Sequence, residues 1–340
     1  MHLYSHRNPK PNKTCAVIRY GAIGDALMAS SIFPALKEMG YHLTVYTVPV
    51  GHEVLKHDPN VDRFVVQDVD AIPNQQLGEF WDYIKPKYSK FINLCESLER
   101  NLLLMSENMA FHWTHEMRHK HFNKNYVEFV HDIAGVPMPC RSRFYETPEE
   151  RAWALEEKAR IGGKVILWVL SGSAIHKVSP HLDSVIDATL RTYQDARFVL
   201  VGGKDCKILE MGWEKTPQVH LKSGKWSIRE TLAFAQVADL VVGPETGVLN
   251  GVAMEAVEKV VMLSHSSAEN LTRDWMNTVS LMPTNTPCYP CHRLHMAKDG
   301  FKHCKESEKN KGVAECQQNI SAQDIFAAIN ATFIYNRKAA

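Results

Sequence analysis

Four cysteines near the end of the chain are spaced as metal ligands. Cys288, Cys291, Cys304 and Cys316 form a C-x2-C-x12-C-x11-C pattern among His, Lys and Gly residues. Four thiolates suit a tetrahedral zinc or iron site, and such a closed site leaves no open position for chemistry. The segment has few apolar residues, so a bound ion would supply stability that its core cannot. We therefore predict a structural zinc or iron site within residues 288–316.

Other interpretations of these cysteines remain open. His292, His295 or His303 could replace one thiolate, or the four thiols could be unrelated. Disulfides are not expected in a cytoplasmic protein, which the chain's composition favours. The other four cysteines are scattered and are interpreted as core or incidental residues: Cys15, Cys95, Cys140 and Cys206.

A second pattern, at residues 238–261, is typical of a phosphate site. The apolar run Leu240–Val242 predicts a buried strand, and Gly243-Pro244 is expected to end it. Glu245-Thr246-Gly247 then opens a helix, followed by a further strand from Lys259. Backbone N–H groups at such a helix start point outward and attract phosphate. The alternative, in which Thr246 only caps the helix, stays open.

A similar unit begins the chain. Cys15–Tyr20 predicts a strand, Gly21–Asp25 a glycine turn and Ala26–Met39 a helix. Pro34 falls inside that helix, so we expect a kink or an early stop there. Asp25 at the end of the turn would direct its carboxylate toward a cleft or would cap the helix.

These turns need parallel sheets to position them. Strands and helices alternate in both halves, which predicts an α/β protein with two Rossmann-like domains and ligand sites at the carboxyl ends of the strands. The capping pattern Thr147-x-x-Glu150 suggests the junction. We expect an N-terminal domain over residues 1–150 and a C-terminal domain over residues 151–320. The amphipathic segment Ser321–Asn336, with Ser321 as a cap, is a final helix.

The composition argues against several classes of protein. The chain has 340 residues, 23% charged and 45% hydrophobic, with a formal net charge of +1, so bulk attraction to nucleic acid is not indicated. The polar start and the lack of ~18 consecutive apolar residues argue against a signal peptide or a membrane span. A cytoplasmic protein is expected, with at most peripheral contact at the inner face of the membrane.

Four segments, in order, resemble glycosyltransferase family 9, the heptosyltransferase family: GAIGDALMASSIFPALKE, SGSAIHKVSPHL, ETLAFAQVADLVVGPETGVLNGVA and LSHSSAEN. The resemblance implies a GT-B fold with the nucleotide sugar on the C-terminal domain and the acceptor on the N-terminal one. It also implies that the last helix, within residues 321–340, crosses back to the first domain. Some members of the family carry a similar cysteine cluster with which iron is associated.

The resemblance implies roles for individual residues. Asp25 matches the general base, and Lys177 matches a lysine on the donor phosphates. Glu245 stands where the family usually has Asp, and Asn250 stands where it usually has His, so the donor can differ from ADP-heptose. The residues expected to bind the donor are Gly24, Ser171, Ser173, Glu245, Thr246, Gly247, Asn250, Glu269 and Asn270.

The function that this resemblance implies is sugar transfer with inversion, with heptose as the first choice of sugar. Candidate acceptors are a surface glycan, lipopolysaccharide or another lipid-linked glycan, or a protein. No nucleic acid is expected, and no metal is needed at the transfer site if Lys177 and the Thr246-Gly247 turn neutralise the diphosphate. The His- and Lys-rich stretch His112–Asn125 fits a basic acceptor surface or a solvated helix end. The alternatives are a nucleotide-sugar epimerase-like enzyme and a metal-stabilised binding protein without activity.

Overall fold

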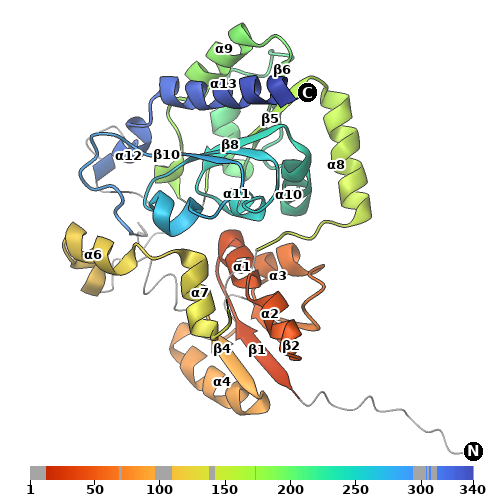
Figure 1. Ribbon diagram of the computed structural model, residues 1–340, viewed down its shortest axis with the longest axis vertical. Helices are drawn as coiled ribbons and strands as arrows, with labels where there is room; N and C mark the ends of the chain where they lie inside the picture. The colour runs from red at the N-terminus through yellow and green to blue at the C-terminus, as the bar shows by residue number, and fades with distance from the viewer. Residues whose placement is uncertain are drawn as a thin grey trace, which may run out of the picture.

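The computed structural model describes residues 13–68, 71–95, 109–137, 142–172, 174–293, 304, 306–307 and 312–339. Two parallel sheets, each flanked by helices, lie one above the other (Figure 1). The N-terminal sheet has the order β3-β2-β1-β4. Its strands are β1 (Thr14–Ile18), β2 (His42–Thr47), β3 (Arg63–Val66) and β4 (Lys90–Asn93).

The C-terminal sheet has the order β10-β9-β8-β5-β6-β7. Its central strands read as unbroken apolar runs because helices cover both faces of a parallel sheet. Strand β8 includes Gly243 and Pro244, which pair with Val261 and Met262, so it ends two residues later than the sequence predicted. The strands are β5 (Lys164–Val169), β6 (Ala196–Val201), β7 (Val219–Leu221), β8 (Leu240–Pro244), β9 (Glu258–Met262) and β10 (Thr278–Leu281).

Helices connect the strands of both sheets. In the N-terminal half they are α1 (Ile23–Ser30), α2 (Phe33–Glu38), α3 (Pro49–Leu55), α4 (Leu77–Ile84), α6 (His115–Phe122) and α7 (Tyr126–Ala134). The remaining helices are α8 (Pro148–Ile161), α9 (Leu182–Thr192), α10 (Ile228–Val237), α11 (Gly247–Gly251), α12 (Glu315–Gln318) and α13 (Ala322–Ala339).

Local sequence signals are confirmed at several helix ends. Pro34 is the second residue of α2, which follows a break after α1, so the predicted first helix is two short ones. Thr147 and Glu150 form the predicted capping box at the start of α8. The Ser321 hydroxyl accepts a hydrogen bond from the Asp324 backbone N–H (3.1 Å), which confirms the predicted cap.

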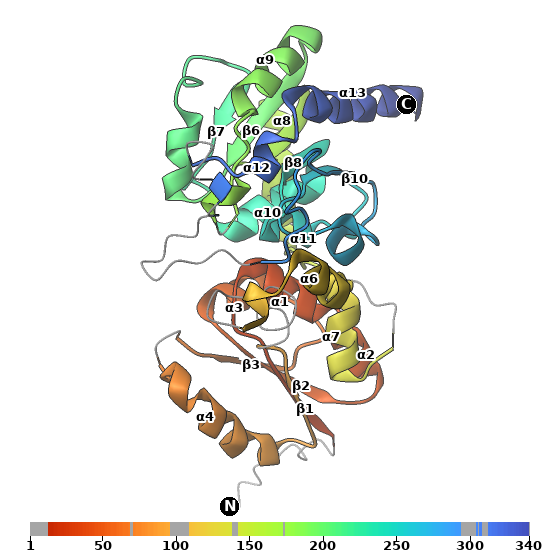
Figure 2. The same ribbon diagram turned by 90° about the vertical axis from the view of Figure 1, so that its left-hand side faces the viewer.

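The expected crossing of the last helix to the first domain is wrong. Ile325, Ile329 and Phe333 of α13 are buried in the apolar cluster of the C-terminal sheet. The helix packs against α9, on the side of that domain away from the N-terminal sheet (Figures 1 and 2). Its apolar stripe therefore completes the core of its own domain.

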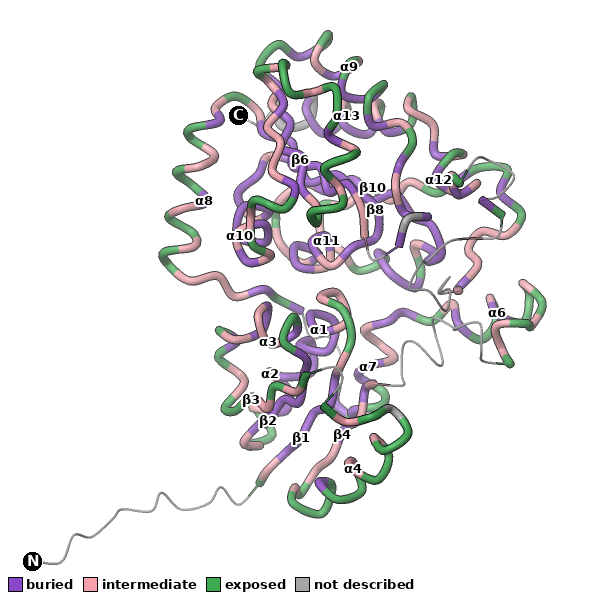
Figure 3. The backbone as a smooth tube through the Cα atoms, turned by 180° about the vertical axis from the view of Figure 1, so that it is seen from behind, coloured by how far each residue is buried: buried purple, intermediate pink, exposed green. Residues whose placement is uncertain are grey.

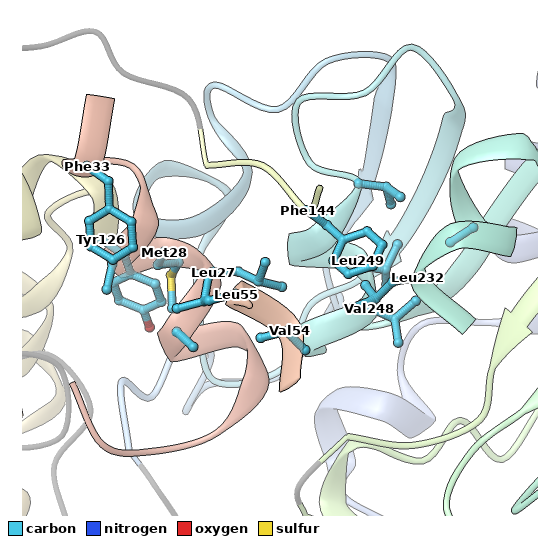
Figure 4. Packing of buried hydrophobic residues seen from close by; sticks show 14 of the residues in the cluster. Leu27, Met28, Phe33, Val54, Leu55, Tyr126, Phe144, Leu232, Val248 and Leu249 are labelled. Atoms are coloured by element: carbon cyan, nitrogen blue, oxygen red, sulfur yellow. The ribbon is translucent and has the colours of Figure 1, made fainter. Parts of the chain in front are cut away.

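One apolar cluster continues from one domain into the other. Leu27 and Leu55 of the N-terminal domain and Leu232 and Leu249 of the C-terminal domain belong to it (Figure 4). Figure 3 shows buried backbone on both sides of the junction between α1 and α11. Because both helices follow strand ends, this contact brings the two predicted ligand sites together.

Candidate functional site

The N-terminal turns of α1 and α11 touch across the domain interface. A Cβ added at Gly24 would lie 2.9 Å from Asn250 Nδ2 and 3.5 Å from Gly247 Cα. One added at Gly247 would lie 3.0 Å from the Gly24 nitrogen and 2.8 Å from the Ile23 side chain. Glycine at both positions permits this approach. Residues predicted for the donor site thus meet the first glycine turn directly.

Asp25 is held at this junction by two contacts. Its Oδ1 forms an ion pair with the Arg19 guanidinium at 3.0 Å, and its Oδ2 accepts a hydrogen bond from the Ala22 backbone N–H at 2.8 Å. The second contact stabilises the start of α1. Ala22 is the residue before the helix and Asp25 is its third residue, so Asp25 is not the N-cap considered from the sequence but bonds back to that position. Each carboxylate oxygen has two lone pairs, so both contacts leave acceptor positions. Arg19, which directly follows β1 and precedes Asp25 by six residues, was not predicted from the sequence.

The loop that contains Lys177 lies against the Glu245-Thr246 turn. Lys177 is buried, with 8% of its surface exposed, and its Nζ donates a hydrogen bond to the Glu245 carbonyl at 3.0 Å. A Cβ on Gly172 would lie 2.9 Å from the Lys177 side chain and 3.3 Å from that of Thr246. The structure therefore places an ammonium charge at the predicted phosphate turn.

Thr246 and Asn250 both bond within the turn and helix. Thr246 Oγ1 accepts from the Leu249 backbone N–H, as a helix cap does, and Asn250 Nδ2 donates to the Thr246 carbonyl. Helix α11 covers only five residues. Attraction for phosphate here would therefore come from local N–H groups and Lys177 more than from a long helix dipole.

The Glu245 carboxylate is buried and holds the loop after β9 by hydrogen bonds. Its Oε1 accepts hydrogen bonds from the backbone N–H groups of Ser264 (2.7 Å) and His265 (2.9 Å), and His265 Nδ1 lies 3.2 Å away. Burial works to raise the pKa of Glu245, but His265, Lys177 and Ser264 together hold that pKa well below its ordinary value. Glu245 is thus ionised and turned toward the loop that follows β9.

The other predicted donor residues are placed differently. Ser171 is half-buried and donates to the Gly172 carbonyl. Asn270 is buried and accepts from the Ser267 backbone N–H at 2.7 Å, while Glu269 is exposed and pairs with Arg273. Ser173 lies outside the described residues. The geometry does not bring Glu269 to the Gly24–Gly247 junction by any described contact.

The four cysteines line one cavity beside this site. Cys288, Cys291, Cys304 and Cys316 surround a volume of about 40 Å³, which exceeds the ~10–15 Å³ needed for one water. His176 and His265 line the same cavity, with their ring centroids 6.1 Å apart. His295, His303 and Cys140 lie outside the described residues. Because His176 precedes Lys177 and His265 contacts Glu245, the cavity lies next to both Lys177 and the Glu245 carboxylate.

The thiols have the donor chemistry of a metal site, although ligating geometry is not shown. Within the described ranges, no three His, Cys, Asp or Glu side chains are grouped so that they could hold an ion. Burial raises the pKa of Cys291 to about 12, and Cys288 and Cys304 add to that rise. Burial likewise raises the pKa of Cys316. A divalent cation would reverse this effect because it binds thiolates.

Helix α6 faces the cysteine segment. Arg118 Nε donates to the Cys291 carbonyl at 3.0 Å, and His115 Nε2 lies 3.0 Å from the Pro290 carbonyl oxygen. His119 Nδ1 lies 3.2 Å from His292 Nε2. Part of the His- and Lys-rich stretch is therefore an internal contact between the domains. The exposed residues of that helix, such as Lys120, still fit a basic surface.

Helix α7 and the turn before it also join the domains. The hydroxyl groups of Tyr126 and Ser266 are hydrogen-bonded at 2.9 Å, and Asn125 Nδ2 donates to the Glu269 carbonyl at 3.3 Å. Arg273 pairs with Glu128 at 2.8 Å. Sequence patterns gave no indication of these contacts, since each joins residues about 140 positions apart.

No helix among the described residues is both long and apolar enough to cross a membrane. The sequence matches no protein-family model and no curated protein.

Solved structures share the architecture. A family 9 glycosyl transferase from Veillonella parvula DSM 2008 aligns over 95% of this chain and 98% of its own, with a TM-score of 0.65 and 15% identity. The ADP-heptose lps heptosyltransferase II of E. coli aligns over 96% of this chain and 99% of its own, with a TM-score of 0.64 and 13% identity. The iron-containing dodecameric glycosyltransferase TibC, from enterotoxigenic E. coli H10407, aligns over 97% of this chain and 78% of its own, with a TM-score of 0.57 and 13% identity. TibC is also known in complex with ADP-D-beta-D-heptose. At these identities the likeness shows the fold, which is the predicted GT-B arrangement.

Proposed function

We propose that the protein is an inverting glycosyltransferase that uses a nucleotide-diphosphate sugar. The observation that carries this proposal is the meeting of the Gly24-Asp25 turn with Gly247, beside the Lys177 ammonium group. A carboxylate from one domain and a phosphate-binding turn from the other are the groups that this reaction needs.

The chemistry follows from this placement. The acceptor hydroxyl gives its proton to Asp25 as its oxygen forms a bond to the anomeric carbon. The bond from that carbon to the diphosphate breaks on the opposite face, which inverts the configuration. Lys177 and the N–H groups of the Thr246-Gly247 turn stabilise the charge that develops on the leaving diphosphate.

We take ADP-heptose as the first donor to test. Two structural neighbours, heptosyltransferase II and TibC, are associated with ADP-heptose by name or by complex. Asn250 in place of the family's usual His leaves other nucleotides open. A surface glycan, lipopolysaccharide or a protein side chain is the proposed acceptor.

The first experiment is a thermal-shift screen with ADP, UDP, GDP, CDP and dTDP. A ligand at 100 times its Kd adds about 2.7 kcal/mol to stability. At about 2–4 °C per kcal/mol for a domain of about 150–250 residues, this raises Tm by about 5–11 °C. We expect ADP to give the largest shift, and Lys177→Met to reduce it. Absence of any shift with all five nucleotides would overturn the proposal.

We also propose that the four cysteines hold a structural zinc or iron ion. Their convergence on one cavity supports this, as does the iron in TibC. Elemental analysis of the purified protein should find about one such ion per chain, because four thiolates complete one tetrahedral site. Cys288→Ser should remove it, whereas Cys206→Ser, outside the cavity, should not. Metal-free wild-type protein would overturn this proposal.

A further inference from the structure

The segment that follows β9 is bonded on both sides. On one side, the N–H groups of Ser264 and His265 donate to the Glu245 carboxylate. On the other side, backbone carbonyls of the same segment accept hydrogen bonds from residues next to the cysteines. The loop is therefore a layer between the Glu245 turn and the cysteine cavity.

Two bonds reach this layer from the cysteine segment. The His292 backbone N–H, adjacent to Cys291, donates to the His265 carbonyl at 2.9 Å. Gln317 Nε2, adjacent to Cys316, donates to the Leu263 carbonyl at 3.4 Å, and Gln317 is completely buried. Both halves of the cysteine pattern therefore contact residues 263–265.

The Glu245 side chain is long enough to make this connection. It begins in the turn and ends at the N–H groups of residues 264–266, with the contact to Ser266 the longest at 3.5 Å. Since Glu245 is only 4% exposed, a carboxylate that lost its partners would remain as a buried charge without compensation, which is costly. Glu245 and residues 264–266 must therefore move together.

We infer that the cysteine segment positions the phosphate-binding turn of residues 245–247, through Gln317, His292 and the Glu245–His265 pair. The role of that turn in holding a diphosphate rests on the proposed function. The connection between the cysteine segment and the turn, through the hydrogen bonds described above, does not rest on the proposed function. Glu245 and His265 are positioning residues, because they act on the donor through the turn.

Gln317→Ala tests the link without touching a thiol. It removes the bond to Leu263 and keeps every cysteine, so its metal content should equal that of the wild type. We expect faster amide hydrogen exchange at residues 245–251 and weaker ADP binding, by roughly 5- to 150-fold if the coupling is typical. Gln218→Ala is the matched control, because Gln218 Nε2 also donates to a carbonyl, that of Gln194 at 3.1 Å. It should change neither measurement.

A double-mutant cycle on ADP affinity provides the second test. Glu245→Gln and Cys291→Ser should each weaken ADP binding, and the double variant should be no weaker than the worse single one, because both break one connection. Glu210→Gln and Cys206→Ser are matched controls: Glu210 is a buried carboxylate that accepts from the Ser223 N–H at 2.8 Å.

The outcomes separate the two proposals. Unchanged exchange at residues 245–251 in Gln317→Ala would overturn the link, whatever the ADP affinities are. Additive losses in the cycle would overturn it as well. Faster exchange in a protein that binds none of the five nucleotides would confirm the link and overturn the proposed function. If Cys291→Ser fails to fold, Cys304→Ser takes its place in the cycle.

Discussion

Arg229 and Glu150 form a buried ion pair where the chain enters the C-terminal domain. Nε and one terminal nitrogen of Arg229 donate to the two oxygens of Glu150, and that terminal nitrogen also donates to the Tyr145 carbonyl. The other terminal nitrogen donates to the carbonyls of Glu53 and Val54 at the end of α3. Arg229 is only 2% exposed. One guanidinium thus joins α10, the linker and the N-terminal domain.

Removing Arg229 should destabilise the protein. Arg229→Met removes the cation that pairs with Glu150, whose carboxylate then keeps the hydrogen bond from the Thr147 backbone N–H. Breaking a buried pair in this way costs about 3–5 kcal/mol. Urea unfolding should show a loss near the lower limit, because Glu150 retains some exposure. Arg151→Met is the control: its pair with Glu146 lies at the surface and should cost less than about 1 kcal/mol. Equal losses of unfolding free energy in Arg229→Met and Arg151→Met would show that the Arg229 pair stabilises the protein no more than a surface pair does.

Gly247→Ala should separate the two turns. The added methyl group would lie 2.8 Å from the Ile23 Cβ and 3.0 Å from the Gly24 nitrogen, mostly against backbone and a branched side chain. Overpacking of this kind costs about 1–3 kcal/mol, and the proposed ADP site should weaken with it. Gly203→Ala is the control, since a Cβ there meets no atom within 4 Å. A Gly247→Ala protein with wild-type Tm and ADP affinity would contradict the close contact.

Glu157 should contribute stability that depends on pH. Its hydrogen bond with Arg160 is the largest cause that lowers its pKa to about 2, and Lys222 adds to this effect against a cost of burial. In the unfolded chain the pKa of Glu is about 4.3. The contribution is therefore complete above that value and disappears as pH falls toward 2.

Comparing Glu157→Gln with the wild type from pH 7 to pH 2 measures this contribution. The variant should be less stable by roughly 1 kcal/mol at pH 7, and the difference should shrink to zero in acid. Glu156→Gln, at the exposed neighbouring position, should show no such trend. A constant difference between wild type and Glu157→Gln across the range would contradict the assignment.

Local signals in the sequence were sufficient for much of the fold. Pro34 predicted a break, Thr147 with Glu150 predicted a helix start, and the apolar run at Leu240 predicted a central strand. Strand β7 was missed because three residues carry too little pattern. The α13 stripe predicted a buried face but could not indicate which domain would cover it.

The candidate site was predictable where its residues lie in turns after strands. The turns of Asp25 and Gly247 were identified in this way, whereas Lys177 and the base role of Asp25 were implied by the resemblance to the glycosyltransferase family. The structure brings these turns together. Arg19 and Gln317 were not identified from the sequence. Their contacts, an ion pair and a buried amide hydrogen bond, depend on tertiary packing that leaves no periodic pattern. Glu245 was expected at the donor, yet its carboxylate is turned into the protein.

Asp25→Asn tests the proposed base. The amide keeps the size of the side chain and can still accept a hydrogen bond from Ala22 through its oxygen, but it cannot take a proton from the acceptor. General-base catalysis contributes about 10²–10⁴-fold, so transfer from ADP-heptose, measured as ADP released in the presence of acceptor-containing extracts, should fall by that factor. The ADP-induced Tm shift should remain, since Asp25 is not proposed to hold the diphosphate.

Two further variants make this test specific. Arg19→Lys keeps a positive charge near Asp25 but loses the planar geometry of the guanidinium, so its transfer rate should lie between those of the wild type and Asp25→Asn. Asp62→Asn is the control, because Asp62 pairs with Lys37 away from the junction, and it should transfer at the wild-type rate. If Asp25→Asn retains near wild-type turnover with an intact fold, Asp25 only stabilises the start of α1 and the base must be sought elsewhere.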